Sequence, residues 1–251
     1  MGSCPANMIF DGEKHCDRAF GGVVGFLPMQ PDTNPPGATI VTPLAFEATR
    51  VRLTARQNAW PLLVCGPGRG GIQRMADQCR IPAGHVVILA GLAGGLDPEL
   101  ETGHFLVADA VIDGSGRERI PPLRLNGRGG VICTSDSLCD TPGAKAQLRA
   151  RTGADAVDME SMHFAALAEE RAWRWGVVRG ISDDASSPLP RGCGNWTDPG
   201  GRSRPWRVFR SILADPKVGF QLPGLRRRAI LGMRSVGEGL EQLLVREPPS
   251  P

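Results

Sequence analysis

The sequence predicts a three-layer α/β/α domain built on a mixed, mostly parallel sheet. Short strand-like runs alternate with helical patterns over residues 38–187, as expected when helices cover both faces of such a sheet. Acidic residues follow two of these runs, at Asp158 to Glu160 and at Asp183. Because open α/β sheets bind ligands at the carboxyl ends of their strands, we expect a functional site where these acids lie.

The expected elements start after residues 31–37, a run of proline and other turn residues that is typical of a linker. Residues 1–37 are therefore expected to form a loose N-terminal extension, and residues 38–251 the folded domain. The strand-like runs lie at residues 39–41, 62–65, 86–90, 105–111, 130–133, 156–157 and 175–181.

Two helical patterns matter for the organisation of the second half. Between the last two strands, small residues recur at helical spacing and would let a helix pack close to the sheet; they are Ser161, Ala165, Ala168 and Ala172. After the last strand we expect an inserted, cap-like segment over residues 188–228. A final helix is expected over residues 229–247, with an apolar stripe that covers the core; the stripe consists of Ile230, Met233, Val236, Leu240 and Leu243.

Charge and composition argue against several classes of protein. A net charge of +3 over 251 residues is too small to indicate a nucleic-acid partner. The glycine turns at residues 66–68 and 94–95 do not form G-x-G-x-x-G, which disfavours a dinucleotide-binding oxidoreductase. Seven cysteines without a C-x-x-C pair argue against a disulfide framework and a structural zinc site, so we expect no metal. No long apolar run or signal-peptide pattern occurs, and we expect a cytoplasmic protein.

Two motifs at the expected site resemble those of a known family. They are Val157-Asp158-Met159-Glu160 and Arg179-Gly180-Ile181-Ser182-Asp183. The sequence V-[DE]-M-E followed by R-x-I-S-D is typical of the purine nucleoside phosphorylases and the related methylthioadenosine/S-adenosylhomocysteine nucleosidases. Further stretches resemble the family in the same order, so that the resemblance covers roughly residues 40–187; they lie at 40–47, 65–71, 90–96, 103–109 and 134–139.

This resemblance implies an enzyme that cleaves the N-glycosidic bond of an adenosyl compound and releases adenine, by hydrolysis or phosphorolysis. The ribose becomes an oxocarbenium-like cation, so the reaction needs an acid for the base nitrogen, a clamp for the sugar and a nucleophile. By resemblance, Asp183 is the acid at purine N7 and Ser182 orients it. Glu160 would hold the ribose hydroxyl groups, with Met159 against the sugar face. Glu47 corresponds to the glutamate that activates water or positions the nucleophile.

The resemblance also implies a nucleophile pocket and a base pocket. Backbone N–H groups of the turn at Gly66 and Gly68, together with Arg69, suit an oxyanion such as phosphate, which would be a co-substrate, and we expect no other cofactor. Leu92 stands where several family members carry a small hydroxyl residue, which removes one donor. The other residues expected to bind the substrate are Ala93, Gly94, Leu138 and Cys139. Leu138 replaces a phenylalanine that would stack on the purine, at a cost of about 1 kcal/mol.

The sequence is consistent with several hypotheses for the specific substrate. Residues 206–228 have a general similarity to the corresponding part of bacterial hopanoid-associated phosphorylases. Adenosylhopane is therefore the more specific hypothesis for the substrate. The alternatives are a methylthioadenosine/S-adenosylhomocysteine nucleosidase and a non-catalytic nucleoside- or lipid-binding module. The same stretch mixes apolar and arginine residues, which suits either ordinary packing or a peripheral contact with the inner face of the membrane. We also expect a homo-oligomer, a dimer or larger.

Overall fold

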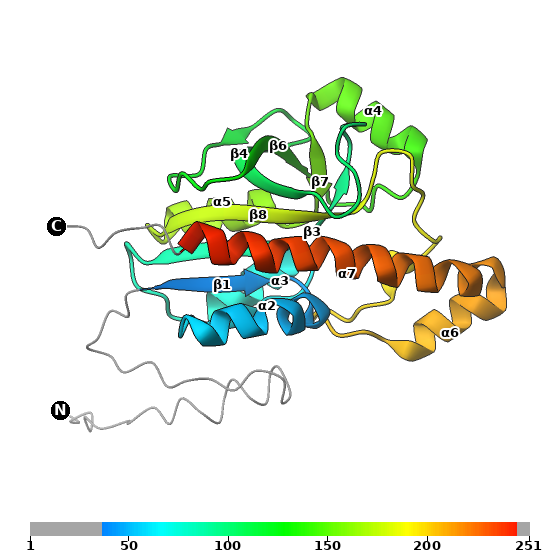
Figure 1. Ribbon diagram of the computed structural model, residues 1–251, viewed down its shortest axis with the longest axis horizontal. Coiled ribbons are helices and arrows are strands. Elements are labelled where there is room, and N and C mark those ends of the chain that lie inside the picture. Colours follow the sequence, from blue (N-terminus) through cyan, green and yellow to red (C-terminus); the bar gives the residue numbers. More distant parts are fainter. Residues whose placement is uncertain (1–36, 245–251) are drawn as a thin grey trace, which may run out of the picture. The chain divides into compact units, whose positions relative to one another are not determined.

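The computed structural model describes residues 37–244, and the expected N-terminal extension lies outside this range except for Gly37 (Figure 1). The described strands are β1 (Ala38–Thr42), β2 (Leu62–Val64), β3 (Val86–Gly95), β4 (Phe105–Asp113), β5 (Glu118–Arg119), β6 (Arg128–Thr134), β7 (Ala156–Asp158) and β8 (Arg174–Asp183). The described helices are α2 (Ala45–Gln57), α3 (Gly68–Gln78), α4 (Pro142–Thr152), α5 (Ser161–Glu170), α6 (Pro205–Ala214) and α7 (Lys217–Leu244), with a 3₁₀ turn at Cys193–Asn195.

All the described strands belong to one mixed sheet. Its order is β2-β1-β3-β7-β6-β4-β5, and β8 pairs with both β3 and β4. Strands β2, β1, β3 and β8 run parallel to one another, as do β7, β6 and β4, while antiparallel pairs join β3 to β7, β4 to β8 and β4 to β5. The prediction of a mixed, mostly parallel sheet is confirmed.

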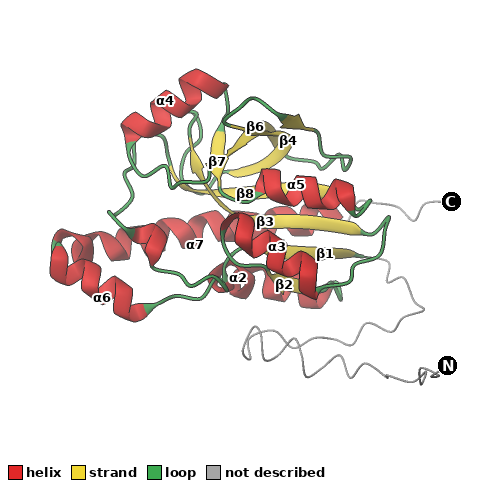
Figure 2. Ribbon diagram, turned by 180° about the vertical axis from the view of Figure 1, so that it is seen from behind, coloured by secondary structure: helices red, strands yellow, loops and turns green. Residues whose placement is uncertain are grey.

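Helices cover both faces of this sheet. Helices α2 and α7 lie on one face and α3 and α5 on the other, as the two opposite views show (Figures 1 and 2). The core on the α3–α5 side contains Phe164 of α5 and Trp175 of β8, whose rings meet edge to face at 6.3 Å. The three-layer prediction is therefore confirmed, and the small residues of α5 do face the sheet, because Ser161, Ala165 and Ala168 are fully buried.

Helix α7 packs unusually close to the middle of the sheet. Gly180 of β8 lies against Gly232 of α7, and a Cβ atom on Gly180 would overlap the carbonyl oxygen of Gly232. Two glycines therefore allow backbone contact between the helix and the strand. This contact fixes α7 beside the carboxyl end of β8, where Asp183 lies.

The C-terminal segment differs from the expected division at residue 228. Helix α7 begins at Lys217 and continues through Pro223, so residues 217–228 are part of the final helix and not of a separate cap. Pro223 is exposed, and its missing N–H group costs the helix one hydrogen bond without ending it. Within residues 37–244, no helix is both long and apolar enough to cross a membrane.

Candidate active site

The acidic residues singled out in the sequence are buried at the carboxyl ends of neighbouring strands. Glu47 lies in the first turn of α2, just after β1, and Glu160 immediately precedes α5, just after β7. Asp183 is the last residue of β8. Each is at most 6% exposed. Burial of carboxyl groups at strand ends needs compensation by donors, and the following contacts provide it.

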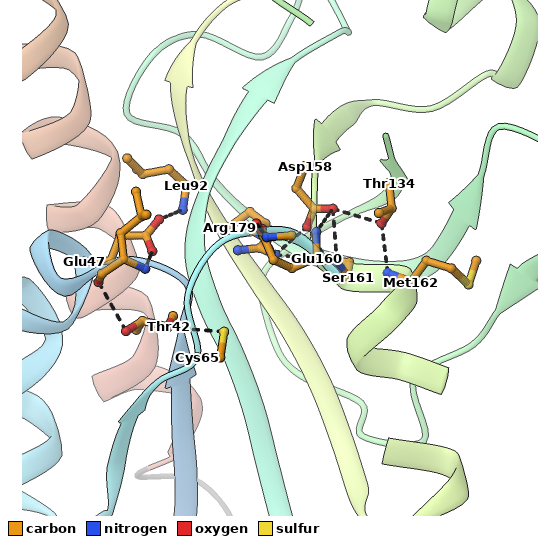
Figure 3. Close-up of polar contacts among 12 residues, drawn as sticks. Thr42, Glu47, Cys65, Leu92, Thr134, Asp158, Glu160, Ser161, Met162 and Arg179 are labelled. Carbon is orange, nitrogen blue, oxygen red and sulfur yellow. Dashed lines mark hydrogen bonds and ion pairs between the residues drawn. The ribbon is translucent and has the colours of Figure 1, made fainter. Parts of the chain in front are cut away.

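Glu47 is held by two backbone N–H groups. Its Oε2 accepts a hydrogen bond from Leu44 N (2.7 Å) and its Oε1 accepts one from Leu92 N (2.8 Å), as Figure 3 shows. Burial raises the pKa of Glu47 from 4.5 to about 7, against the opposing effects of the Leu92 hydrogen bond and the Arg179 charge. A carboxyl group with this pKa can accept a proton near neutral pH, which suits a general base.

Arg179 lies at the centre of the acidic cluster. Its side chain is fully buried, and its Nη2 lies 2.5 Å from Asp158 Oδ2 and 3.6 Å from Glu160 Oε2. Its Nη1 lies beside Gly91, because a Cβ atom there would stand 2.6 Å from Nη1 and 2.9 Å from Glu47 Oε1. Neither Nε nor Nη1 of Arg179 has a hydrogen-bond partner among the described residues. Two buried donors are thus available to a ligand.

Asp158 holds Arg179 and has little capacity left for a substrate. Its Oδ1 accepts hydrogen bonds from Thr134 Oγ1 (2.9 Å) and from the N–H groups of Glu160 (3.3 Å) and Ser161 (3.2 Å). Its Oδ2 accepts one from Ser161 Oγ in addition to Arg179. Asp158 therefore orients Arg179, and Figure 3 shows its contacts with Arg179 and Thr134.

Glu160 is tied to the glycine turn that precedes α3. Its Oε1 accepts a hydrogen bond from Gly68 N at 2.8 Å. Gly68 has a φ of 66°, a left-handed conformation that favours glycine. Burial raises the pKa of Glu160 from 4.5 to about 7, although the Arg179 charge opposes this.

Of the expected phosphate ligands, Gly68 and Leu92 contact the acidic cluster through their N–H groups. The N–H of Gly68 is already bonded to Glu160, and Leu92 donates its N–H to Glu47. Arg69 is exposed and lines a cavity of about 590 Å³ with residues of α5 and the end of β6, and neither Glu47 nor Asp183 lines that cavity.

Asp183 is turned toward β3 by an irregularity of the sheet. Gly91 and Gly94 of β3 pair with Arg179 and Asp183, so Ser182 is an extra residue on β8, as in a β-bulge. A Cβ atom on Gly94 would stand 3.1 Å from Asp183 Oδ2, so glycine leaves space beside that carboxyl group. Ser182 Oγ donates to Asp183 Oδ1 at 2.5 Å, which agrees with an orienting role.

The remaining predicted ligands surround the same edge. The Ala93 carbonyl accepts a 3.3 Å hydrogen bond from Ser182 Oγ. Met159 is half-buried between Asp158 and Glu160, whereas Leu138 is partly exposed and lies against Gly194. Burial raises the pKa of the Cys139 thiol, and the nearby Asp183 charge adds to this.

Sequence reasoning missed Lys145, which is fully buried in α4 and ion-paired with Asp183 at 2.5 Å. It also assigned no role to Arg179 or Thr134. In the sequence the only signal for Lys145 is the rarity of lysine, which occurs three times in the chain. Among residues 37–244, no three metal-binding side chains lie close enough to hold an ion.

Comparison with known proteins gives a family match over part of the chain and a fold match over most of it. Residues 122–192 match the model of the phosphorylase superfamily. The S-adenosylhomocysteine nucleosidase of Streptococcus pyogenes, in complex with 5-methylthiotubericidin, has a TM-score of 0.59 at 16% identity, over 86% of this chain and 99% of that one. The futalosine hydrolase mutant of Helicobacter pylori has a TM-score of 0.58 at 14% identity, over 84% and 99%.

A methylthioadenosine/S-adenosylhomocysteine nucleosidase of Colwellia psychrerythraea, in complex with adenine, has a TM-score of 0.56 at 14% identity, over 83% of this chain and 94% of that one. No curated protein matches the sequence. The solved structures share the fold, and the segment that matches the family model contains both Val157-Asp158-Met159-Glu160 and Arg179-Gly180-Ile181-Ser182-Asp183. Residues 122–192 therefore match the phosphorylase superfamily, and the chain shares its fold with the solved nucleosidase structures.

Proposed function

We propose that this protein cleaves the N-glycosidic bond of an adenosyl compound and releases adenine. The observation that carries this proposal is the arrangement of buried acids along β3. Gly91 lies beside Glu47 and Arg179, and Gly94 lies beside Asp183. Three residues of a strand span about 10 Å. This distance suits a nucleoside with its purine near Asp183 and its ribose near Glu160 and Glu47.

In the proposed reaction, Asp183 donates a proton to purine N7 while the C1′–N9 bond breaks and its electron pair enters the ring. Glu160 binds the ribose hydroxyl groups that lie beside the developing cation. Glu47, with a pKa of about 7, takes the proton of an attacking water molecule. The reaction requires no cofactor and no metal.

Hydrolysis is the version that we favour, because the Gly68 N–H is already bonded to Glu160, and Arg69 lines a cavity that neither Glu47 nor Asp183 lines. Phosphorolysis is the second candidate. It is supported by the unpaired Nε and Nη1 of Arg179, since a buried guanidinium with free donors suits an oxyanion.

The direct test is adenine release from 5′-methylthioadenosine and S-adenosylhomocysteine by the purified protein, followed by chromatography with and without phosphate. We expect adenine in both cases, with the free sugar as the second product. A strict requirement for phosphate and formation of a sugar 1-phosphate would replace hydrolysis by phosphorolysis. Tight binding of nucleosides without any adenine release would instead support a non-catalytic module.

We further propose that the natural substrate carries a hydrophobic 5′-substituent, of which adenosylhopane is an example. The support comes from an apolar and basic surface on α6 and the start of α7, which we define by Trp206, Arg207, Phe209, Arg210 and Phe220. Trp206 is 67% exposed and Phe220 is 87% exposed, and no residue of α6 is buried. Trp206 and Phe209 stack with ring centroids 5.5 Å apart.

This surface has the chemistry of a peripheral membrane contact, since exposed aromatic rings enter the interface and arginines bind anionic headgroups. Figure 1 shows α6 and the first turns of α7 beyond the end of the sheet, away from β1. Anionic liposomes should bind the wild type more than a Trp206→Ser/Phe209→Ser/Phe220→Ser variant. Leu53→Ser, which removes an exposed leucine of α2, is the matched control. Equal binding by all three proteins would remove the membrane contact from the proposal.

A further inference from the structure

A buried lysine in α4 is bonded only to the segment that carries Asp183. Lys145 has no exposed surface. Its Nζ lies 2.5 Å from Asp183 Oδ2 and within 3.3 Å of three backbone carbonyl oxygens, which are those of Asp183 (3.3 Å), Asp184 (2.6 Å) and Ser187 (3.2 Å). The ammonium group therefore connects α4 with the end of β8 and the turn that follows.

Packing alone does not account for a lysine at this position. Burial of an ammonium group is unfavourable unless it is paired, and an apolar residue of similar size is often the more stable choice for a buried site. The helix itself is secured by other means, because Thr141 Oγ1 caps its first turn at Ala144 N (3.2 Å) and Leu148 packs into the core below. The charge of Lys145 thus needs an explanation beyond the stability of α4.

Lys145 and Ser182 together immobilise the Asp183 carboxyl group. Ser182 Oγ binds Oδ1 and Lys145 Nζ binds Oδ2, so that rotation of the carboxyl plane would break a hydrogen bond on either side. The charge of Arg228 in α7 also acts on Asp183, and the titratable thiols of Cys139 and Cys193 interact with it electrostatically.

We propose that Lys145 is a positioning residue for the acid step: it fixes the orientation of the Asp183 carboxyl group and is the counterion of the carboxylate that forms when the proton leaves. This inference rests on the proposed function. As the Asp183 O–H bond breaks and the N7–H bond forms, negative charge appears on the carboxyl group beside the ammonium of Lys145. An interaction that strengthens in the transition state lowers the barrier of the chemical step.

The test compares Lys145→Met with Asp183→Asn and with the double variant, using Lys217→Met, which changes an exposed lysine, as the control. We expect Lys145→Met to lower kcat by about 10- to 100-fold with little change in KM, because a misoriented catalytic group costs about that much. In the Asp183→Asn background the same change should have almost no further effect. Lys217→Met should retain wild-type turnover of small adenosines.

Two further readouts separate positioning from mere support of the fold. Burial raises the pKa of Asp183 and Lys145 opposes this, so the descending limb of kcat against pH should move to higher pH in Lys145→Met. In Lys145→Ala, methylammonium or ethylammonium ions should restore part of the turnover, while trimethylated ions should not. If the losses in kcat are additive in the double variant and the descending limb of the kcat–pH profile does not move, the proposal is overturned.

The proposal can be tested even if the protein releases no adenine. The ¹³Cγ signal of Asp183 should then titrate at higher pH in Lys145→Met than in the wild type, and coincident titration curves would refute the pairing. If Lys145→Met does not fold, Lys145→Met/Asp183→Asn leaves no unpaired charge. Recovery of folding by the double variant would support the ion pair, and persistent unfolding would assign Lys145 to support of residues 184–187 instead.

Discussion

Replacement of Glu47 by glutamine should change the pH dependence of stability as well as the activity. Burial raises the pKa of Glu47 from 4.5 to about 7. Between these two pH values the folded protein holds a proton that the unfolded chain has released, so the unfolding free energy falls as the pH rises. A shift of this size corresponds to about 3 kcal/mol, all of it lost above pH 7. The glutamine variant has no such titration.

A lost hydrogen bond also contributes to the difference in unfolding free energy between Glu47→Gln and the wild type. Both carboxyl oxygens of Glu47 accept a backbone N–H, one from Leu44 and one from Leu92. A glutamine side chain offers one oxygen, so its NH₂ group would face a donor and one hydrogen bond would be lost, at about 1–3 kcal/mol. Because this loss does not depend on pH, Glu47→Gln should be clearly less stable than wild type at pH 5 and close to wild type at pH 8.

The measurement is urea and thermal unfolding of both proteins at pH 5, 6, 7 and 8. A change of about 3 kcal/mol should move the difference between the melting temperatures by about 6–12 °C over this range, for a chain of this length. Glu99→Gln, which changes an exposed carboxyl group, is the control. A difference that stays constant from pH 5 to pH 8 would refute the assignment of a buried, titrating Glu47, and near-normal adenine release by Glu47→Gln would refute its role as the base.

Three further substitutions test the proposed acid, the proposed sugar ligand and the contact between α7 and the sheet. Asp183→Asn should lower kcat by at least about 100-fold while circular dichroism shows an intact fold, because general acid catalysis contributes that much; near-normal adenine release would remove Asp183 from this role. Glu160→Gln should weaken ribose binding and turnover, and 2′-deoxy or 3′-deoxy substrates should lose most of their disadvantage in the variant; additive losses would argue against direct contact. Gly180→Ala should lower the unfolding free energy by about 1–3 kcal/mol, since the new Cβ atom would overlap Gly232 of α7; an unchanged melting curve would show that α7 can move away without cost.

The parts of the fold that could be predicted from the sequence are those that depend on the spacing of residues close together in the chain. Alternation of apolar runs with helical spacing indicated the layers, and the two motifs placed Glu160 and Asp183 at strand ends. Local patterns carry such information because side-chain periodicity follows directly from backbone geometry. The start of α7 could not be predicted in the same way, because Pro223 and Gly224 resemble a helix boundary while the structure continues the helix through both.

The features of the site that could not be predicted from the sequence are contacts between residues far apart in the chain. Lys145 meets Asp183 across 38 residues, and the Gly68 N–H meets Glu160 across 92. No spacing rule connects such pairs, since only the packing of α4 and α3 against the strand ends brings them together. The occupied Gly68 N–H also shows why a glycine turn alone did not define a phosphate pocket: its donor is used within the protein.

The charges that remain buried within the described core argue for a ligand. Arg179 is paired with Asp158 and lies near Glu160 and Glu47, yet its Nε and Nη1 have no partner. Unpaired buried donors are costly, and apolar residues at these positions would often give a more stable fold. The arrangement fits the proposed site, in which substrate oxygens would accept hydrogen bonds from these donors. Glycine at position 91, opposite Arg179 in the β3–β8 register, keeps this space open, because any side chain there would lie between Arg179 Nη1 and Glu47 Oε1.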